Sequence, residues 1–166
     1  MPRKDKAANR IVAALIALMQ EKPYGEITAT DVAARAGVSR MAFYRNFSSK
    51  EDIISRYIDT VGRQVSESVA GTAGLKEYFE ALFRLLGRYS TMIKEVCAAH
   101  LGELILAYLN KRLFSTPIRA NVLAVDKYRL RLFAGAFYNV LVEWICSGMG
   151  ESAESMAGLC CAMITD

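Results

Sequence analysis

Residues 39–47, with the sequence SRMAFYRNF, constrain the fold of this 166-residue chain more than any other stretch, because both of its ends carry helix-start signals. Ser39 is of the type preferred for capping the first turn of a helix. At the other end, Ser48 and Glu51 have the spacing of a capping box, in which a hydroxyl group and an acid three residues later satisfy free helix amides. We therefore predict a short helix within residues 39–47 and the start of another just after it.

A second short helix is predicted immediately before this stretch. Thr28 and Asp31 have the spacing of another capping box, which opens a helix over the apolar Val32 and Ala36. Gly37 then ends that helix, because glycine readily adopts the positive φ that is common at helix ends. Two short helices joined by a glycine-containing turn predict a helix-turn-helix.

Basic residues gather in the same region. From residue 35 to residue 50 every charged residue is basic: Arg35, Arg40, Arg45 and Lys50. Residues 1–66 carry 11 Lys and Arg against 7 Asp and Glu, whereas residues 67–166 carry ten of each kind. A positive charge confined to one half favours nucleic acid as the partner of that half. A merely solvated basic face explains the pattern less well, because the charges coincide with two capped helices and with Tyr44 and Asn46, which we expect to be exposed.

Four segments of this region share the pattern of a known family. They are Ile27-Thr28, Val32-Ala33-Ala34-Arg35-Ala36-Gly37-Val38-Ser39, Phe43-Tyr44-x-x-Phe47 and Ser49-Lys50-Glu51-Asp52-Ile53. In these segments the chain resembles the TetR family of bacterial transcriptional regulators. The resemblance covers about residues 8–60, and the remainder matches only as an all-helical pattern of suitable length. It implies a DNA-binding domain of three helices followed by a helical domain that binds an effector and forms a dimer.

The resemblance also implies which side chains face DNA. In proteins similar to this one, residues matching Tyr44 and Lys50 contact phosphates, and residues from the recognition helix face the major groove or its walls. The predicted DNA-binding residues are Thr28, Thr30, Ser39, Arg40, Met41, Ala42, Tyr44, Arg45, Asn46 and Lys50. We interpret Phe43 and Phe47 as core residues that hold the two short helices together.

Two of these positions depart from the family pattern. Ala42 stands where a hydroxyl residue is common, which removes a hydrogen bond to phosphate, and Asn46 stands where His is common. Asn46 can still donate to phosphate or pair with adenine, and Met41 can lie on thymine methyl groups. An alternative interpretation is therefore a TetR-like interaction or co-activator module that no longer binds DNA.

The rest of the chain is predicted to be helical. Residues 49–70 form a connecting helix with an apolar stripe that includes Ile54 and Ile58, and glycines at positions 71 and 74 break the pattern. No stretch alternates apolar and polar residues for long enough to indicate a sheet. We predict an all-α chain: a helix-turn-helix DNA-binding domain over residues 1–48, the connecting helix, and a helical ligand-binding and dimerisation domain over residues 71–166.

Three helices predicted within residues 75–116 would enclose the cavity for a small-molecule effector that the family resemblance implies. Its candidate lining is Phe79, Phe83, Leu86, Met92, Cys97, His100, Tyr108, Phe114 and Phe137. Aromatic and Met side chains at helical spacing also fill an ordinary core, so both interpretations stay open for each residue. A mostly apolar lining favours an apolar or aromatic effector. An anionic effector would pair with His100, Arg84 or Arg88.

The last quarter of the chain carries an assembly signal. Apolar residues surround the helix predicted over residues 130–144 on nearly all sides, so it must be covered on two faces. A second stripe follows after the break at residues 148–150. Two such helices from each of two chains make a four-helix contact, which resembles the dimer contact of the TetR family. The predicted interface residues are Leu130, Phe133, Trp144, Met156, Leu159, Cys160 and Met163.

Other classes of protein fit the sequence less well. The chain has one histidine and no G-x-S-x-G, H-E-x-x-H or glycine-rich phosphate loop, so we predict no enzyme. Its four cysteines lack zinc spacing, and we expect neither metal nor cofactor. The apolar segment at residues 11–19 is too short to span a bilayer and has the stripe of an amphipathic helix, so we expect a cytoplasmic protein. The predicted function is a homodimeric repressor that a small effector releases from a palindromic DNA operator.

Overall fold

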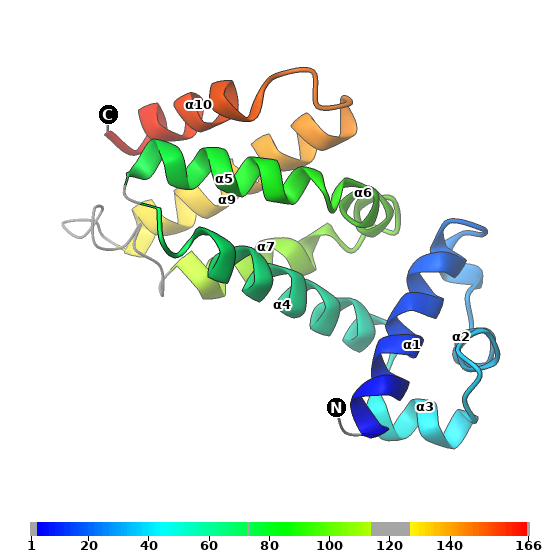
Figure 1. Ribbon diagram of the computed structural model, residues 1–166. Coiled ribbons are helices and arrows are strands. Elements are labelled where there is room, and N and C mark those ends of the chain that lie inside the picture. Colours follow the sequence, from blue (N-terminus) through cyan, green and yellow to red (C-terminus); the bar gives the residue numbers. More distant parts are fainter. Residues whose placement is uncertain (1–2, 73, 114–126, 166) are drawn as a thin grey trace.

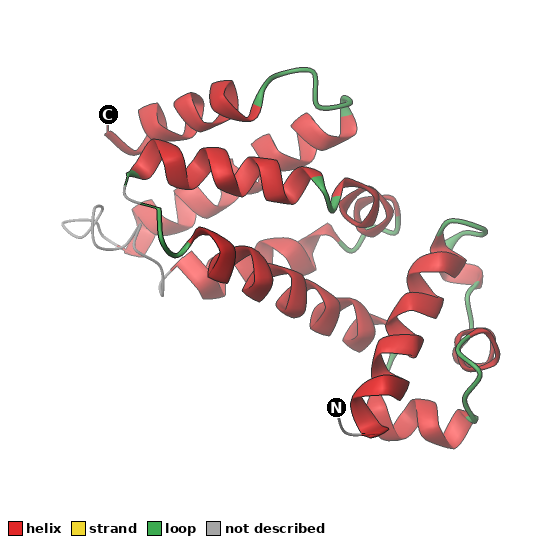
Figure 2. Cartoon of the chain, in the orientation of Figure 1, coloured by secondary structure: helices red, strands yellow, loops and turns green. Residues whose placement is uncertain are grey.

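The computed structural model describes residues 3–72, 74–113 and 127–165, and all regular elements in these ranges are helical (Figure 2). They are α1 (Arg3–Met19), the 3₁₀ turn η1 (Tyr24–Glu26), α2 (Ala29–Arg35), α3 (Arg40–Asn46), α4 (Lys50–Val69), α5 (Leu75–Gly87), α6 (Ser90–Ala98), α7 (Gly102–Leu113), α9 (Lys127–Cys146) and α10 (Ala153–Thr165). The all-α prediction is confirmed.

The helices form two groups joined by α4 (Figure 1). Helices α1, α2 and α3 pack together at one end, and α5, α7, α9 and α10 form a bundle at the other. Helix α4 packs on α1 at its beginning and on α5 and α7 further along, and α6 also touches α1. The two groups therefore share contacts through α4 and α6.

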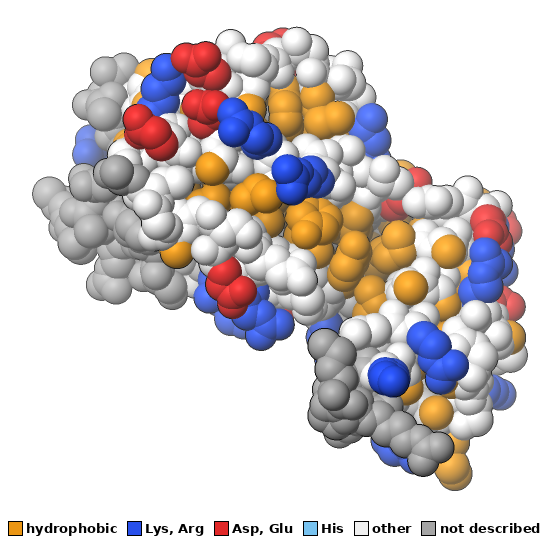
Figure 3. Space-filling view, in the orientation of Figure 1, with side chains coloured by type: hydrophobic (Ala, Val, Ile, Leu, Met, Phe, Trp, Pro, Cys, Tyr) orange, Lys and Arg blue, Asp and Glu red, His pale blue; other side chains and the backbone are white. Residues whose placement is uncertain are grey.

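The amphipathic stripe predicted for the first helix forms the centre of the amino-terminal group. Ile11, Leu15, Leu18 and Met19 are all buried. Phe43 and Phe47 are buried beside them, which confirms their interpretation as core residues. An apolar groove runs between α1 and α4, with Val12, Ile16, Phe47 and Tyr57 among its lining residues. Figure 3 shows apolar side chains gathered along this face of the molecule.

The caps of α2 and α3 lie where the sequence predicts them. The Asp31 amide donates to Thr28 Oγ1 over 3.1 Å, and the Thr28 amide donates to the Asp31 carboxylate over 2.9 Å, which completes a capping box. The Ala42 amide donates to Ser39 Oγ over 3.1 Å at the start of α3. These bonds satisfy amides that a short helix otherwise leaves free.

The turn between α2 and α3 depends on Gly37. Its φ is +63°, the left-handed conformation that favours glycine. The Val38 amide donates to the Ala33 carbonyl over 2.9 Å and the Gly37 amide donates to the Ala34 carbonyl over 3.1 Å, which is the Schellman pattern of a helix end.

The start of α4 differs from the prediction by one residue. The capping residue is Ser49, whose hydroxyl accepts from the Asp52 amide over 3.2 Å, and the Asp52 carboxylate accepts from the Ser48 amide over 2.9 Å. Glu51 instead accepts a hydrogen bond from the Tyr24 hydroxyl. The predicted pair of Ser48 and Glu51 was wrong because adjacent serines and adjacent acids allow two registers, and the Tyr24 contact favours the later one.

Candidate functional site

The recognition helix α3 presents one polar and basic face to solvent. Met41 and Tyr44 are 79% and 53% exposed, and Arg40 and Arg45 are exposed beside them. These four positions follow the i, i+1, i+4, i+5 spacing of one helical face. The opposite face carries Phe43 into the core. The structure thus brings four of the predicted DNA-binding residues together on a single outward surface.

Asn46 does not belong to that surface. Its side chain is only 8% exposed, and its Nδ2 donates to the Ala42 carbonyl over 2.6 Å, within the same helix. The expectation of an exposed Asn46 was wrong, because it lies three residues after the buried Phe43 and so shares the inward stripe of α3. Ala42 is half-buried, whereas Thr28, Thr30 and Ser39 are exposed.

The four basic residues of this region are not equivalent. Arg35 forms two hydrogen bonds with the Glu21 carboxylate, one of them 3.0 Å long, and this contact lowers the pKa of Glu21. No carboxylate among the described residues pairs with Arg40 or Arg45. The positive charge that no carboxylate of the described residues pairs therefore lies on Arg40, Arg45 and Lys50 rather than along the whole predicted window.

Lys50 is positioned by the 3₁₀ turn η1. Its Nζ donates to the Tyr24 carbonyl over 2.8 Å and lies 4.1 Å from the centroid of the Tyr24 ring. The Tyr24 hydroxyl donates to Glu51 over 2.6 Å, and burial together with Glu51 raises the pKa of Tyr24. An ammonium group carries three donors, so Lys50 keeps two for a phosphate.

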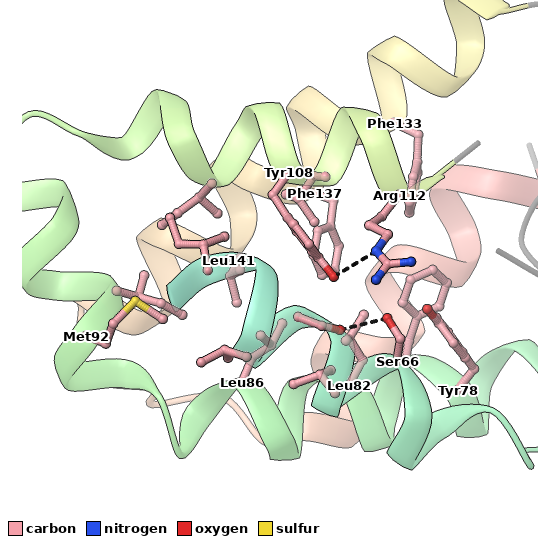
Figure 4. A pocket seen from close by; sticks show the side chains of 18 residues that line it. Ser66, Tyr78, Leu82, Leu86, Met92, Tyr108, Arg112, Phe133, Phe137 and Leu141 are labelled. Carbon is pink, nitrogen blue, oxygen red and sulfur yellow. Dashed lines mark hydrogen bonds between the residues drawn. The ribbon is translucent and has the colours of Figure 1, made fainter. Parts of the chain in front are cut away.

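A cavity of about 90 Å³ lies among α4, α5, α7 and α9, with α6 at one end (Figure 4). Of the predicted lining, Phe79, Leu86, Met92, Tyr108 and Phe137 border it. Phe83, Cys97 and His100 do not, and Phe114 lies outside the described residues. The expectation that three consecutive helices enclose the cavity was wrong, because α4 forms one wall and α9 another.

His100 and Phe83 show why the lining was only partly predicted. His100 occupies the turn that connects α6 to α7, with φ +59°, and is exposed, so its ring is not enclosed by packed helices. Phe83 is fully buried against Phe137 and Trp144, with ring centroids 5.6 and 5.3 Å away. Neither Arg84 nor Arg88 borders the cavity, and both are exposed.

Several lining residues were missed. The wall formed by α4 consists of Ile58, Val61, Gly62, Val65 and Ser66. Its apolar stripe was visible in the sequence, but spacing alone does not tell which helix the stripe packs against. Phe133 was predicted for the dimer interface and instead lines the cavity.

One end of the cavity is polar. Arg112 Nε donates to the Tyr108 hydroxyl over 3.2 Å, and the Ser66 hydroxyl donates to the Gly62 carbonyl over 2.8 Å (Figure 4). Burial and the neighbouring Tyr108 raise the pKa of Tyr78, so its phenol stays protonated at neutral pH. The other end, around Leu86 and Met92, is apolar.

Gly62 allows a close approach between α4 and α7. A Cβ atom at this position would lie 2.1 Å from Tyr108 Cζ, far inside van der Waals contact. A glycine within a helix costs about 0.5 to 1 kcal/mol relative to alanine. This cost is offset by the packing of the Tyr108 ring directly on the backbone of the connecting helix.

Much of the predicted dimer surface is covered within one chain. Leu130, Trp144, Met156 and Cys160 are buried, because α5 packs on α10 and α7 packs on α9. Part of the surface that was predicted to need a second chain is therefore covered by helices of the same chain. Leu159 and Met163 are exposed, together with Leu132, which is 72% exposed on the outer face of α9.

Of the four cysteines, Cys160 is buried in the core, Cys97 and Cys161 are partly buried, and Cys146 is exposed. Burial, and then the adjacent Cys161, raises the pKa of Cys160 to about 12, and burial also raises the pKa of Cys97. Within the described residues, no three His, Cys, Asp or Glu side chains are grouped as metal ligands would be. None of the helices in these ranges combines the length and apolar character needed to cross a membrane.

Comparison with known sequences identifies the amino-terminal region. Residues 11–57 match the family described as bacterial regulatory proteins, tetR family. An uncharacterized HTH-type transcriptional regulator of Mycobacterium tuberculosis is 41% identical over 64 residues, which are 38% of this chain and 30% of that protein. The chain thus matches under a third of the length of these curated relatives.

Solved structures extend the likeness to nearly the whole chain. A putative transcriptional regulator from Rhodococcus sp. RHA1 has a TM-score of 0.64 at 18% identity, covering 95% of both chains. FadR of Thermus thermophilus, a TetR-family transcriptional repressor in complex with lauroyl-CoA, has a TM-score of 0.56 at 20% identity, covering 95% of this chain and 92% of that one. The resemblance predicted from the sequence is therefore confirmed: residues 11–57 match the TetR family, and nearly the whole chain is similar in fold to solved transcriptional regulators.

Proposed function

We propose that this protein is a homodimeric DNA-binding transcriptional regulator whose affinity for its operator is controlled by a small molecule in the cavity. One observation carries the proposal: α4 forms a wall of the cavity and is separated from the recognition helix by only three residues. A change in the cavity that moves α4 therefore also moves α3. The exposed basic face of α3 favours this function over an interaction module without DNA binding.

The DNA contacts follow from the exposed face of α3. Arg40 and Arg45 supply charge for phosphates or guanine, Tyr44 supplies a hydroxyl group for phosphate, and Met41 an apolar contact for thymine methyl groups. Lys50 contacts a phosphate with the donors that Tyr24 leaves available. Asn46 takes no direct part while it remains bonded to the Ala42 carbonyl.

The dimer forms through the outer faces of α9 and α10. The exposed apolar side chains there include Leu132, Leu159 and Met163, and the small residues Gly158 and Ala162 directly precede the last two on α10. Small residues allow two helices of a second chain to approach closely. A twofold dimer of this kind reads a palindromic operator when its recognition helices lie about 34 to 36 Å apart, or at a larger helical repeat.

The effector acts by favouring a conformation that binds DNA poorly. The size of the effect is limited by the difference in its affinity for the two conformations, typically about 1 to 3 kcal/mol, and operator DNA weakens effector binding by the same factor. Since FadR of Thermus thermophilus is a repressor in complex with lauroyl-CoA, we infer a repressor here as well.

The test begins with selection of binding sequences from a random DNA pool, followed by affinity measurements on the selected duplex. Replacing Arg40 and Arg45 by Ala should weaken binding strongly and lower the slope of log K against log salt by about 0.9 for each phosphate that the variant no longer neutralises. Arg35→Ala is the matched control, because Arg35 is already paired with Glu21. Failure to select any palindromic sequence, with folded dimer present, would refute the proposal.

The oligomeric state is tested separately. Leu132→Glu places a charge on the proposed interface without touching the core, so we expect folded monomers in sedimentation experiments and weak binding to the palindrome. If the wild-type protein is monomeric, or if the Leu132→Glu variant stays dimeric, α9 does not form the dimer interface as proposed.

A further inference from the structure

The polarity of the cavity is strongly divided along its length. Side chains at one end offer polar groups: Ser66, Tyr78, Tyr108 and Arg112. Those at the other end are apolar, with Leu86, Met92 and Leu141 labelled there in Figure 4. Such a cavity favours a ligand that has one polar end and a longer apolar body.

The charged group at the polar end is Arg112, and no carboxylate among the described residues pairs with it. Arg112 uses its Nε to donate to Tyr108, and its guanidinium lies 5.8 Å from the Tyr108 ring. A guanidinium has five donors in a planar fork that matches a carboxylate, so four remain for a ligand.

The phenol of Tyr78 adds a donor at the same end. Its oxygen forms no hydrogen bond with the described residues, and burial keeps the group protonated. A protonated phenol donates to an anion, whereas it gives no advantage to an ammonium group. The same end therefore attracts anions and repels cations, because Arg112 is always charged.

On this basis we propose that the effector is an amphiphilic organic anion whose carboxylate binds Arg112 and Tyr78 and whose apolar body extends toward Met92. The proposal rests on the regulatory function proposed above and specifies its ligand class. It also replaces the residues expected from sequence, since His100, Arg84 and Arg88 lie outside the cavity.

The cavity must open to hold such a molecule. Its volume of about 90 Å³ is smaller than the roughly 150 Å³ of an engineered apolar cavity that binds benzene. The Tyr108 ring is the side chain best placed to move, because it borders the cavity and its hydroxyl is bonded to Arg112, the group that the carboxylate binds. Since that ring rests on Gly62, its displacement alters the packing of α7 on α4.

The experiment compares three probes of equal chain length and different head groups. Sodium octanoate, octan-1-ol and octylamine are titrated calorimetrically into the full chain. We expect octanoate to bind about tenfold or more tightly than the alcohol, as for a charge-assisted hydrogen bond, and octylamine to bind most weakly. The carboxylate advantage should disappear in Arg112→Gln and be partly retained in Arg112→Lys.

The matched control is Arg84→Gln, which removes an exposed arginine on α5 that pairs with Glu80 outside the cavity. It should bind octanoate as the wild type does. Circular dichroism and thermal unfolding show whether each variant is folded, and Arg112→Lys keeps the test valid if Arg112→Gln is not.

Three results would overturn the proposal. These are equal affinity for octanoate and octan-1-ol in the wild type, unchanged octanoate affinity in folded Arg112→Gln, and no binding of any probe up to its solubility. The titrations contain no DNA, so they test the ligand class independently of the regulatory function. The regulatory function is refuted separately, if the protein binds no duplex. If octanoate binds as expected but leaves operator affinity unchanged, the site exists without controlling DNA binding, and its ligand is not an effector.

Discussion

The amino-terminal helices and the bundle are stabilised in different ways. Helices α2 and α3 have seven residues each, far below the length at which an isolated helix is stable in water. Both begin with side-chain caps, at Thr28 and Ser39. In contrast, Gly74 and Tyr89, the capping residues of α5 and α6, form no side-chain cap hydrogen bond, although Ser152 caps α10 by accepting from the Ser155 amide over 3.1 Å.

The bundle depends instead on aromatic packing between helices distant in sequence. Phe79 and Phe83 of α5 pack against Phe133, Phe137 and Trp144 of α9, with ring centroids 5.3 to 6.2 Å apart. Ring pairs at such distances add about 0.5 to 1.5 kcal/mol beyond the burial of their area.

This difference suits the two tasks we propose. Local caps hold a recognition helix whose outer face must stay exposed for DNA. A bundle held by large side chains tolerates a small cavity between α4 and α7, because its stability comes from many separate contacts.

The largest expected effect is the removal of a ring from the bundle. Phe83→Ala removes a fully buried side chain that contacts Phe137 and Trp144, so we expect the free energy of unfolding in urea to fall by about 3 to 5 kcal/mol. Tyr44→Ala removes an exposed ring from α3 and should change stability by about 0.5 kcal/mol or less. Equal losses of stability for the two variants would show that the bundle does not depend on its aromatic contacts in this way.

A smaller effect is expected where α4 meets α7. Gly62→Ala forces the Tyr108 ring aside, which should cost about 1 to 3 kcal/mol, less the helix-propensity gain of up to about 1 kcal/mol. In the control Gly87→Ala, the nearest atoms to the new Cβ lie 3.5 and 3.6 Å away, so this variant should be neutral or slightly stabilised. Thermal unfolding of both variants measures the difference. A stabilised Gly62→Ala would mean that Tyr108 moves freely.

The same contrast explains how far the sequence predicts this structure. The caps at Thr28 and Ser39 and the turn at Gly37 are local signals, so the helix-turn-helix could be located to within a residue. The cap was wrongly placed at Ser48 because the neighbouring Ser49 and Asp52 have the same capping-box spacing as Ser48 and Glu51. Asn46 was also predictable, since its spacing from Phe43 places it on the inward stripe.

The cavity and the outer faces depend on contacts that no local pattern encodes. Met92 and Tyr108 lie in apolar stripes, but the stripes do not show that α4 supplies a wall or that Phe83 turns toward Trp144. Arg112 was not predicted as a site residue, because a basic residue near a helix end is usually exposed. Only the packing of α7 against α4 brings its guanidinium to the cavity.

Removing a helix cap should have a smaller effect, a loss of about 1 kcal/mol in the free energy of unfolding. Ser39→Ala removes the acceptor for the Ala42 amide and should destabilise the amino-terminal group by about 0.5 to 2 kcal/mol. Ser39→Asp keeps an acceptor at the same position and should restore most of that stability. Urea unfolding without DNA separates this structural role from the predicted DNA contact. An unchanged stability in Ser39→Ala would show that α3 does not need its cap.

The smallest effect concerns the charge of Asp31. Its carboxylate accepts hydrogen bonds from Lys22 Nζ and from the Thr28 amide, both over 2.9 Å, and these lower its pKa to about 2. A carboxyl group whose pKa is lower in the folded than in the unfolded state stabilises the fold when ionised. That contribution is complete above the unfolded pKa of about 3.9 and is lost as the pH falls toward about 2.

Asp31→Asn should therefore make stability less sensitive to acid. Asparagine can still accept from the Thr28 amide, but it has no charge to pair with Lys22 and no proton to gain. Urea midpoints of both proteins at about pH 5 and about pH 2.5 measure the change, since every other carboxyl group titrates in both and cancels in the comparison. The wild type should lose more stability between the two pH values than the variant. Identical losses would mean that the pKa of Asp31 is the same in the folded and unfolded chains, and that the capping box depends on geometry rather than on charge.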